Sequence, residues 1–295
     1  MPVMRFMGIA DEAGALLETQ IKATKDLGWT DIEARNVEIE GFPKANLHDI
    51  DDAAFDKAAS MLEEAGVSIY AFGSTIANWG KKIDEPFDLS EVERAIPRMQ
   101  RLGTQYVRIM SYAIRPGGIE DQMVDERVRR LNEIVQRFTD AGLQPVHENC
   151  MNYGGMGWRQ TLELLEKVPG LKLVFDTANP VFNPDYSQPE PRPRQDPWEF
   201  WENVRDHVVH IHIKDCIWRT EKNDADYTYP GEGDAAVRPI LSDALARGYD
   251  AGISIEPHMA VVFHDASVEA DPQEQYDNYV EYGRRLMTLI ESLRS

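Results

Sequence analysis

The sequence is poor in cysteine and contains no long apolar run. Cys150 and Cys216 are its only two cysteines in 295 residues, which is too few for a disulfide framework, and we expect both to be reduced and packed as small core residues. No apolar run approaches the roughly 18 residues that span a bilayer. The beginning of the chain lacks the charged and apolar regions of a secretory signal. These absences predict a cytoplasmic protein with no membrane partner.

Positive charge is also scarce. The chain carries 51 acidic and 31 basic residues, a formal net charge of −20. A nucleic-acid backbone or an anionic membrane surface would be repelled by this charge, so we expect neither as a main partner. The same balance is equally typical of a well-solvated surface.

Short apolar runs alternate along the chain with longer amphipathic ones, the pattern of strand and helix units around a parallel sheet. Eight strands are predicted, at residues 5–10, 29–36, 67–75, 106–113, 143–150, 171–179, 207–216 and 251–258. Helices are predicted between and after them, at residues 13–27, 51–65, 89–102, 121–141, 159–168, 198–205, 235–247 and 273–293. There is no linker or break in composition. The sequence therefore predicts one α/β domain over residues 1–295, a single (β/α)8 TIM barrel.

Two long loops interrupt this pattern in the second half of the chain. Residues 180–197 are crowded with prolines, which argues against a helix or a central strand there. The other loop follows the seventh strand and carries Tyr229 and the glycines at 231 and 233. Because long loops in compact domains are usually functional, we expect both to border the active site.

Four polar side chains stand late in four consecutive strands: Glu148, Asp176, His212 and Glu256. In a TIM barrel the carboxyl ends of the strands meet at one mouth, where the active site lies. Each side chain alone could be a solvated strand end, but together they form a carboxylate-rich set suited to Mn²⁺, Mg²⁺, Co²⁺ or Zn²⁺. Such a cation can hold a carbonyl and a neighbouring hydroxyl and stabilise the charge left when a proton leaves the carbon between them.

The motifs around these residues resemble those of the sugar phosphate isomerase/epimerase superfamily, the xylose isomerase-like barrels. The matching segments are HEN with Glu148, FDTAN with Asp176, HIHIKD with His212 and IEPH with Glu256. The resemblance implies that the quartet binds a divalent metal, with manganese favoured. It also implies that Glu148 and Glu256 exchange a proton next to a carbonyl, through an enediolate that the metal stabilises, in a sugar isomerase or epimerase.

Some positions depart from the ketose 3-epimerase pattern. Asn179 stands where those enzymes have a substrate-binding histidine, Trp218 where they have an arginine, and Gly154 where they have a glutamate. These departures keep a second hypothesis open, a lyase or dehydratase of the same fold acting on a 3-keto-glycoside or an inosose. The related DNA repair enzymes fit less well, because their additional metal-binding histidines are missing.

Further side chains near the predicted mouth are expected to contact substrate. Lys214 shares a strand face with His212 and could stabilise an enolate oxygen or form a salt bridge with a nearby carboxylate. Asn179 and Glu33 are expected to hydrogen-bond substrate hydroxyls, and Trp158 and Trp218 to stack on a sugar ring. His210 lies deeper on the same face as His212, in a supporting or packing role.

The substrate is expected to be a small-molecule carbohydrate. The sequence shows no obvious cluster of arginine or lysine at the predicted mouth, which favours an uncharged sugar or glycoside over a sugar phosphate. A sugar-binding barrel without catalysis is a third hypothesis. Barrels of this kind often form dimers or tetramers, so a homo-oligomer is an open alternative.

Overall fold

The computed structural model describes residues 4–260 and 271–294. Its main sheet has eight parallel strands in the order β1-β12-β9-β8-β7-β6-β5-β2. These strands are β1 (Arg5–Gly8), β2 (Asp31–Ala34), β5 (Ser68–Gly73), β6 (Tyr106–Ile109), β7 (Gln144–Glu148), β8 (Lys172–Asp176), β9 (Val208–Ile213) and β12 (Gly252–Ile255). Each predicted strand therefore forms, and the prediction of a single TIM barrel is confirmed.

The barrel is nearly closed, and its seam lies between β1 and β2. Seven neighbouring strand pairs are joined by parallel ladders, but β1 and β2 are joined by a single bridge between Ile9 and Glu33. This bridge lies just beyond the last residue of β1. The seam is thus closed at the end of the barrel where the strands finish.

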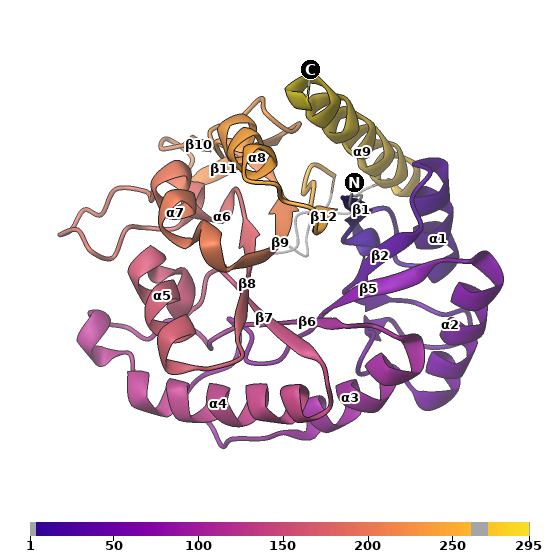
Figure 1. The fold of residues 1–295 in the computed structure, drawn as a ribbon, viewed down its shortest axis with the longest axis horizontal. Helices are drawn as coiled ribbons and strands as arrows, with labels where there is room; N and C mark the ends of the chain where they lie inside the picture. The colour runs from indigo at the N-terminus through magenta and orange to yellow at the C-terminus, as the bar shows by residue number, and fades with distance from the viewer. Residues whose placement is uncertain (1–3, 261–270, 295) are drawn as a thin grey trace.

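Helices surround the strands (Figure 1). They are α1 (Leu17–Asp26), α2 (Asp52–Ala65), α3 (Ser90–Leu102), α4 (Val124–Asp140), α5 (Trp158–Lys167), α7 (Pro197–Val204), α8 (Val237–Ala246) and α9 (Pro272–Arg294). Local signals fix several ends: Asp51 caps α2 by accepting from Ala53 N at 2.8 Å, and Gly66 and Gly103 end α2 and α3 in the left-handed conformation. None of the described helices combines the length and apolarity needed to cross a membrane.

The apolar core lies between the strands and the ring of helices. Phe72 on β5, Phe175 on β8 and Ile211 on β9 are fully buried. Trp201 on α7 packs edge-on against Phe175, with ring centroids 5.3 Å apart. Period-2 alternation in the strands sends these side chains outward to the helices and leaves the intervening positions pointing into the barrel.

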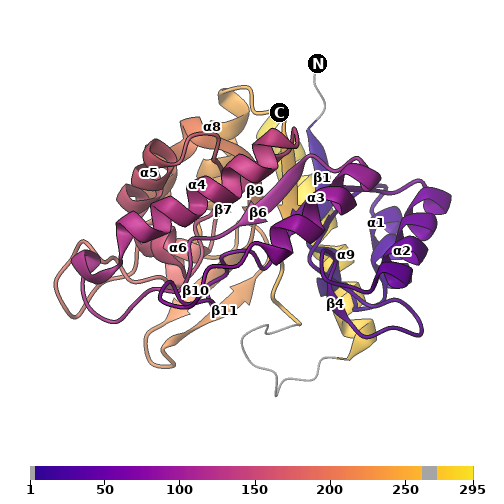
Figure 2. The ribbon, with the colours of Figure 1, turned by 90° about the horizontal axis from the view of Figure 1, so that it is seen from below.

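The two long loops contain more regular structure than their sequence indicates. Residues Asn179–Phe182 form a short helix, α6, which tolerates Pro180 because a proline in the first helical turn removes no helical hydrogen bond. The loop after β9 contains an antiparallel hairpin, β10 (Asp215–Arg219) with β11 (Asp224–Thr228). A smaller pair, β3 (Asn36–Val37) with β4 (Ala45–Asn46), follows β2. Figure 2 shows the hairpin, α6 and β4 gathered at one end of the barrel.

Candidate metal centre

The predicted quartet converges at the carboxyl ends of the strands. Glu148 is the last residue of β7, Asp176 the last of β8, His212 the next to last of β9, and Glu256 directly follows β12. All four side chains are buried, and one potential ligand atom from each lies within 4.8 Å of the others. Parallel register explains the convergence, since His212 is the register partner of Asp176 on one side and of Ser254 on the other.

The imidazole of His212 turns its Nδ1 toward the carboxylates. Its Nε2 lies 2.9 and 3.0 Å from the two oxygens of Glu33, so the proton is held on that nitrogen. Among the described residues, Nδ1 has no hydrogen-bond partner, and the oxygens nearest to it belong to Glu148 at 3.8 Å and Glu256 at 3.9 Å. A buried nitrogen facing a group of carboxylates without bonding to them fits a metal ligand.

Asp176 is fixed in the same way. Its Oδ1 accepts the backbone N–H groups of Ala178 at 2.9 Å and Asn179 at 2.8 Å, while the buried Oδ2 forms an ion pair with Lys214 Nζ at 3.0 Å. One oxygen is therefore occupied by the backbone and the other is directed at the cluster. The donor set of one imidazole and three carboxylates suits a divalent cation of the borderline or hard class.

Glu33 lies beneath the cluster, not at its mouth. It is fully buried, and besides His212 it contacts His210 Nε2 at 2.8 Å and accepts from Ser254 Oγ at 2.6 Å. We expected Glu33 to hydrogen-bond a substrate hydroxyl, but the structure occupies its carboxylate with side chains of β9 and β12. Its role in this geometry is to fix the orientation of His212, and His210 takes the supporting position expected for it.

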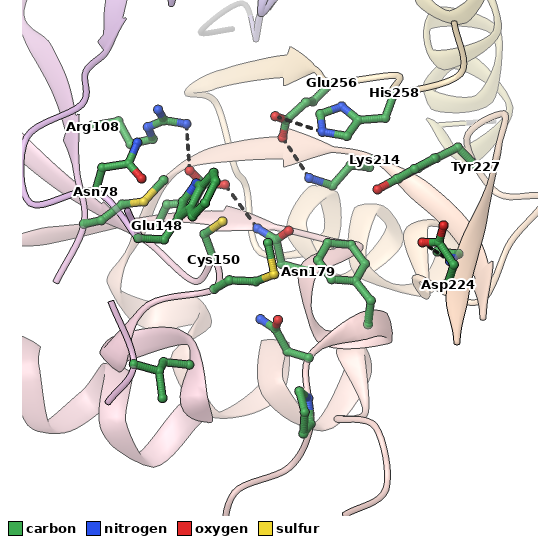
Figure 3. Close-up of a pocket in the computed structure, with 18 of the residues that line it drawn as sticks. Asn78, Arg108, Glu148, Cys150, Asn179, Lys214, Asp224, Tyr227, Glu256 and His258 are labelled. Atoms are coloured by element: carbon green, nitrogen blue, oxygen red, sulfur yellow. Dashed lines mark hydrogen bonds and ion pairs between the residues drawn. The ribbon is translucent and has the colours of Figure 1, made fainter. Parts of the chain in front are cut away.

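Three cations pair with the carboxylates, and two of them, Arg108 and Lys214, are seen in Figure 3 beside Glu148 and Glu256. Lys214 Nζ lies 3.0 Å from Asp176 Oδ2 and 3.0 Å from Glu256 Oε2. Arg108 donates to Glu148 Oε2 at 2.9 Å, and Arg35 donates to Glu256 Oε1 at 3.0 Å. Of the two roles considered for Lys214, the structure displays the salt bridge.

These surroundings shift the pKa values of the site residues in different directions. Burial raises the pKa of Glu148, but Arg108 and His212 outweigh burial and bring it down to about 2. Burial also raises the pKa of Asp176, to about 7, because Lys214 offsets it only in part. For His212 burial lowers the pKa, yet Glu33 and Glu148 raise it well above its usual value. The neighbouring cations therefore keep Glu148 ionised, whereas Asp176 has the higher pKa of the two acids.

The cluster opens into a cavity of about 690 Å³. Glu148 and Glu256 form part of its wall, together with three of the residues expected to bind substrate: Lys214, Asn179 and Trp218. Asn179 donates through Nδ2 to Glu148 Oε1 at 3.1 Å. Figure 3 shows Tyr227, from β11, directed toward Lys214 from the far side of the cavity.

Trp158 does not reach this cavity. It lines a separate small pocket, where its indole N–H donates to Glu199 at 3.2 Å and Arg159 stacks on its ring. The Gly-rich segment before it forms a 3-10 turn, Tyr153–Met156, that leads the chain away from the mouth into α5. Trp158 is therefore not positioned to stack on a sugar in the cavity, as was expected, whereas Trp218 lines the cavity.

The remaining residues of interest take supporting positions. His147 is buried on the opposite side of β7 from the cluster, with Nε2 3.0 Å from both Ser111 Oγ and Asn152 Oδ1. His258 lies at the cavity wall, with Nδ1 2.8 Å from Glu12 Oε1. Cys216 is buried, and Cys150 is partly exposed in the cavity wall.

Three of the positive charges at the mouth were not predicted from the sequence. Among the described residues four basic side chains line the cavity, Lys214, which was expected there, and Arg35, Arg108 and Arg194, which were not. They come from four distant segments, so no local cluster marks them in the sequence. Arg108 did leave a signal, because a charged residue inside the apolar strand YVRIM shares its face with inward positions. Arg35 stands two residues after Glu33 in the predicted strand 29–36 and so shares its face. Arg194 lies in the proline-rich loop, where no pattern marks it.

The family of the chain follows from comparison with known proteins. The profile of the xylose isomerase-like TIM barrel family matches residues 21–289. The chain belongs to this family, as the barrel and the strand-end motifs indicate. No curated protein sequence matches the chain significantly.

Solved structures share the fold over the full length. A xylose isomerase-like TIM barrel protein from Mycobacterium smegmatis in complex with magnesium has a TM-score of 0.68 at 15% identity, covering 99% of this chain and 98% of that one. An L-ribulose 3-epimerase has a TM-score of 0.67 at 14% identity, covering 100% and 96%. A probable 3-DHS dehydratase from Bacillus anthracis has a TM-score of 0.66 at 15% identity, covering 97% and 98%. At these identities the likeness concerns the fold alone.

Proposed function

We propose that the protein is a divalent-metal-dependent sugar isomerase or epimerase that moves a proton on the carbon next to a carbonyl. The observation that carries this proposal is the buried Nδ1 of His212, which faces three carboxylates at the floor of an open cavity without bonding to any described residue. We assign the metal to Glu148, Asp176, His212 and Glu256, with manganese favoured. When bound, the cation would supply charge stabilisation for the oxygens of the substrate.

Proton transfer is assigned to Glu148 and Glu256. They come from β7 and from the end of β12, which are separated in the sheet by β8 and β9, so they approach a substrate from different sides. Asn179 and Arg108 hold the carboxylate of Glu148, and Arg35 and Lys214 hold that of Glu256. Carboxylates fixed in this way stand ready within hydrogen-bond reach of a bound substrate.

A lyase or dehydratase is the second candidate. The same proton abstraction leads to elimination when a leaving group stands one carbon further on. The cavity of about 690 Å³ favours this candidate, because it offers room beyond a single sugar ring for a leaving group such as an aglycone. A probable dehydratase among the structures of the same fold is consistent with it.

The test is incubation of the Mn²⁺-loaded protein in D₂O with ketoses, 3-keto-glycosides and inososes, followed by NMR and mass spectrometry. Deuterium gained beside the carbonyl with an unchanged skeleton supports the isomerase or epimerase. Loss of water or an aglycone supports the lyase. Metal binding without exchange into any of these compounds would instead support a non-catalytic sugar-binding barrel.

Glu256→Gln tests the assigned base. We expect it to retain the fold and lose about 10²- to 10⁴-fold in turnover, because the amide cannot accept the proton. Glu221→Gln, at the exposed tip of the β10–β11 hairpin, is the matched control and should turn over normally. Unchanged turnover in Glu256→Gln would remove this residue from the proton-transfer pair.

A further inference from the structure

Arg194 lies in the wall of the cavity, on the proline-rich segment after α6. This segment folds back on itself, with an antiparallel bridge between Pro184 and Arg194. The guanidinium lies 3.7 Å from the ring centroid of Trp218, and its Nη1 donates to the carbonyl of Phe182 at 2.5 Å. The side chain is therefore held flat against an indole ring and fixed by a backbone contact.

Among the described basic residues of the cavity wall, Arg194 differs from the others because it has no carboxylate partner. The others each face carboxylates, as the pairs Arg108 with Glu148, Lys214 with Asp176 and Glu256, and Arg35 with Asp11, Glu12 and Glu256 show. In the parts of the chain that the structure describes, residues 4–260 and 271–294, Arg194 forms no ion pair, and its Nη2 contacts only the amide oxygen of Asn223 at 3.3 Å. A positive charge thus remains available at the cavity.

Asn183, on the same segment as Arg194, has a side-chain donor with no hydrogen-bond partner among the described residues. Asn183 is 4% exposed and lines the same cavity, and its Nδ2 has no hydrogen bond to any described residue. It directly follows Phe182, whose carbonyl binds Arg194. A buried donor without an acceptor costs about 1–3 kcal/mol, so the pairing of Asn183 and Arg194 suggests that an acceptor belongs there.

We propose that Arg194 and Asn183 form a subsite for a carboxylate carried by the substrate, at the end of the cavity that Trp218 lines. Four residues of chain separate Lys214 from Trp218, so their Cα atoms lie at most about 13 Å apart. Lys214 Nζ lies 5.7 Å from the ring centroid of Phe182, whose carbonyl accepts from Arg194, so the subsite borders the cluster across Phe182. We place the carboxylate on a second group joined to the reacting sugar, so the substrate is a glycoside with an acidic aglycone or an acidic second sugar.

Charge and surroundings favour a carboxylate over a phosphate. One guanidinium and one amide match a single negative charge in a planar group, which a fork of N–H donors binds well. A phosphate dianion would need more donors in a chain whose net charge is already −20. Trp218, Phe182 and Tyr186 line this end of the cavity, and their rings suit a group with an apolar body.

This proposal rests on the proposed function in one respect, that a sugar binds at the metal cluster. It is tested by measuring binding and not turnover. The probes are 4-carboxyphenyl β-D-glucoside and its neutral isostere 4-carbamoylphenyl β-D-glucoside, titrated calorimetrically into Mn²⁺-loaded protein. The variants are Arg194→Met and, as a matched control away from the cavity, Arg205→Met, whose side chain pairs with Asp243 and does not line the cavity. Circular dichroism checks that both variants fold.

We expect the natural protein to bind the carboxylate probe about ten-fold more tightly than the neutral one. Arg194→Met should abolish this preference and leave the affinity for the neutral probe unchanged, and Arg205→Met should keep the preference. Equal affinities in the natural protein, a preference that survives in Arg194→Met, or no binding of either probe at millimolar concentration would each overturn the proposal. A charge preference here, together with no exchange or elimination in the D₂O test with the keto compounds, would keep the subsite and reject the reaction. Exchange or elimination in that test without a charge preference here would reject the subsite alone.

Discussion

His147 is a buried histidine held in its neutral form. Burial lowers its pKa to about 4, although Asn152 and Glu148 act in the opposite direction. Between this pKa and the ordinary value near 6.5 the unfolded chain binds a proton that the folded chain does not. The free energy of unfolding therefore falls as the pH drops through this window, and the contribution of His147 is fully present only above about pH 6.5.

His147→Gln should remove this part of the acid sensitivity. The full contribution of the histidine is about 3 kcal/mol between the two pKa values, so we expect a shallower loss of stability from pH 6.5 to pH 4. Urea denaturation at a series of pH values measures it. His207→Gln, at an exposed histidine, is the control and should follow the natural protein. Identical slopes for His147→Gln and the natural protein would contradict a depressed pKa.

At the scale of single residues, the sequence identified side chains whose position depends on local pattern. Glu148, Asp176 and Glu256 end apolar strands, and His212 alternates with β-branched residues, so each could be directed to the mouth from its own strand alone. The role of Glu33 could not be inferred in this way, because its partners His210 and Ser254 lie more than 170 residues away in the chain.

At the scale of elements, the β10–β11 hairpin was absent from the predicted elements. Its strands contain many charged and polar residues, from Arg219 through Asp226, and they lack the alternation of a half-buried strand. Most of the barrel strands were found because they are buried on both faces, which makes them short apolar runs. The exception is β2, DIEA, in which Ile32 lies between two acids and the pattern is weaker. Exposed hairpins carry no such pattern.

One buried carboxylate fastens the hairpin to the chain that leads into α8. Asp215 accepts backbone N–H groups from Gly231 at 2.8 Å, Gly233 at 3.0 Å and Ala235 at 3.1 Å. Asp215→Ala should destabilise the protein by about 3 kcal/mol, because it leaves these backbone donors without an acceptor. Asp226→Ala, which breaks exposed ion pairs with Arg219 and Lys222, should change stability by less than about 1 kcal/mol. Chemical denaturation compares the two, and equal losses would refute the role of Asp215.

At the scale of the whole molecule, a bound metal should stabilise the barrel. A cation that binds only the folded chain adds about 2.7 kcal/mol at one hundred times its dissociation constant, so we expect the melting temperature to rise by roughly 5 °C or more with Mn²⁺. Differential scanning calorimetry with and without EDTA measures this shift.

Asp176→Ala is the control for the metal effect. Burial raises the pKa of Asp176, so its ionised form is costly without a cation, and we expect the variant to fold while losing the metal-dependent shift. Elemental analysis should find it empty. Full metal occupancy in Asp176→Ala would remove this aspartate from the ligand set.

Glu33 also takes part in the seam of the barrel. Among the described residues its backbone forms the single bridge that joins β1 to β2, through Ile9, and its side chain holds His212 across the interior. A cation bound at His212 would therefore be linked through Glu33 to the seam of the barrel. We expect metal binding to stabilise the pairing of β1 with β2 as well as the site itself.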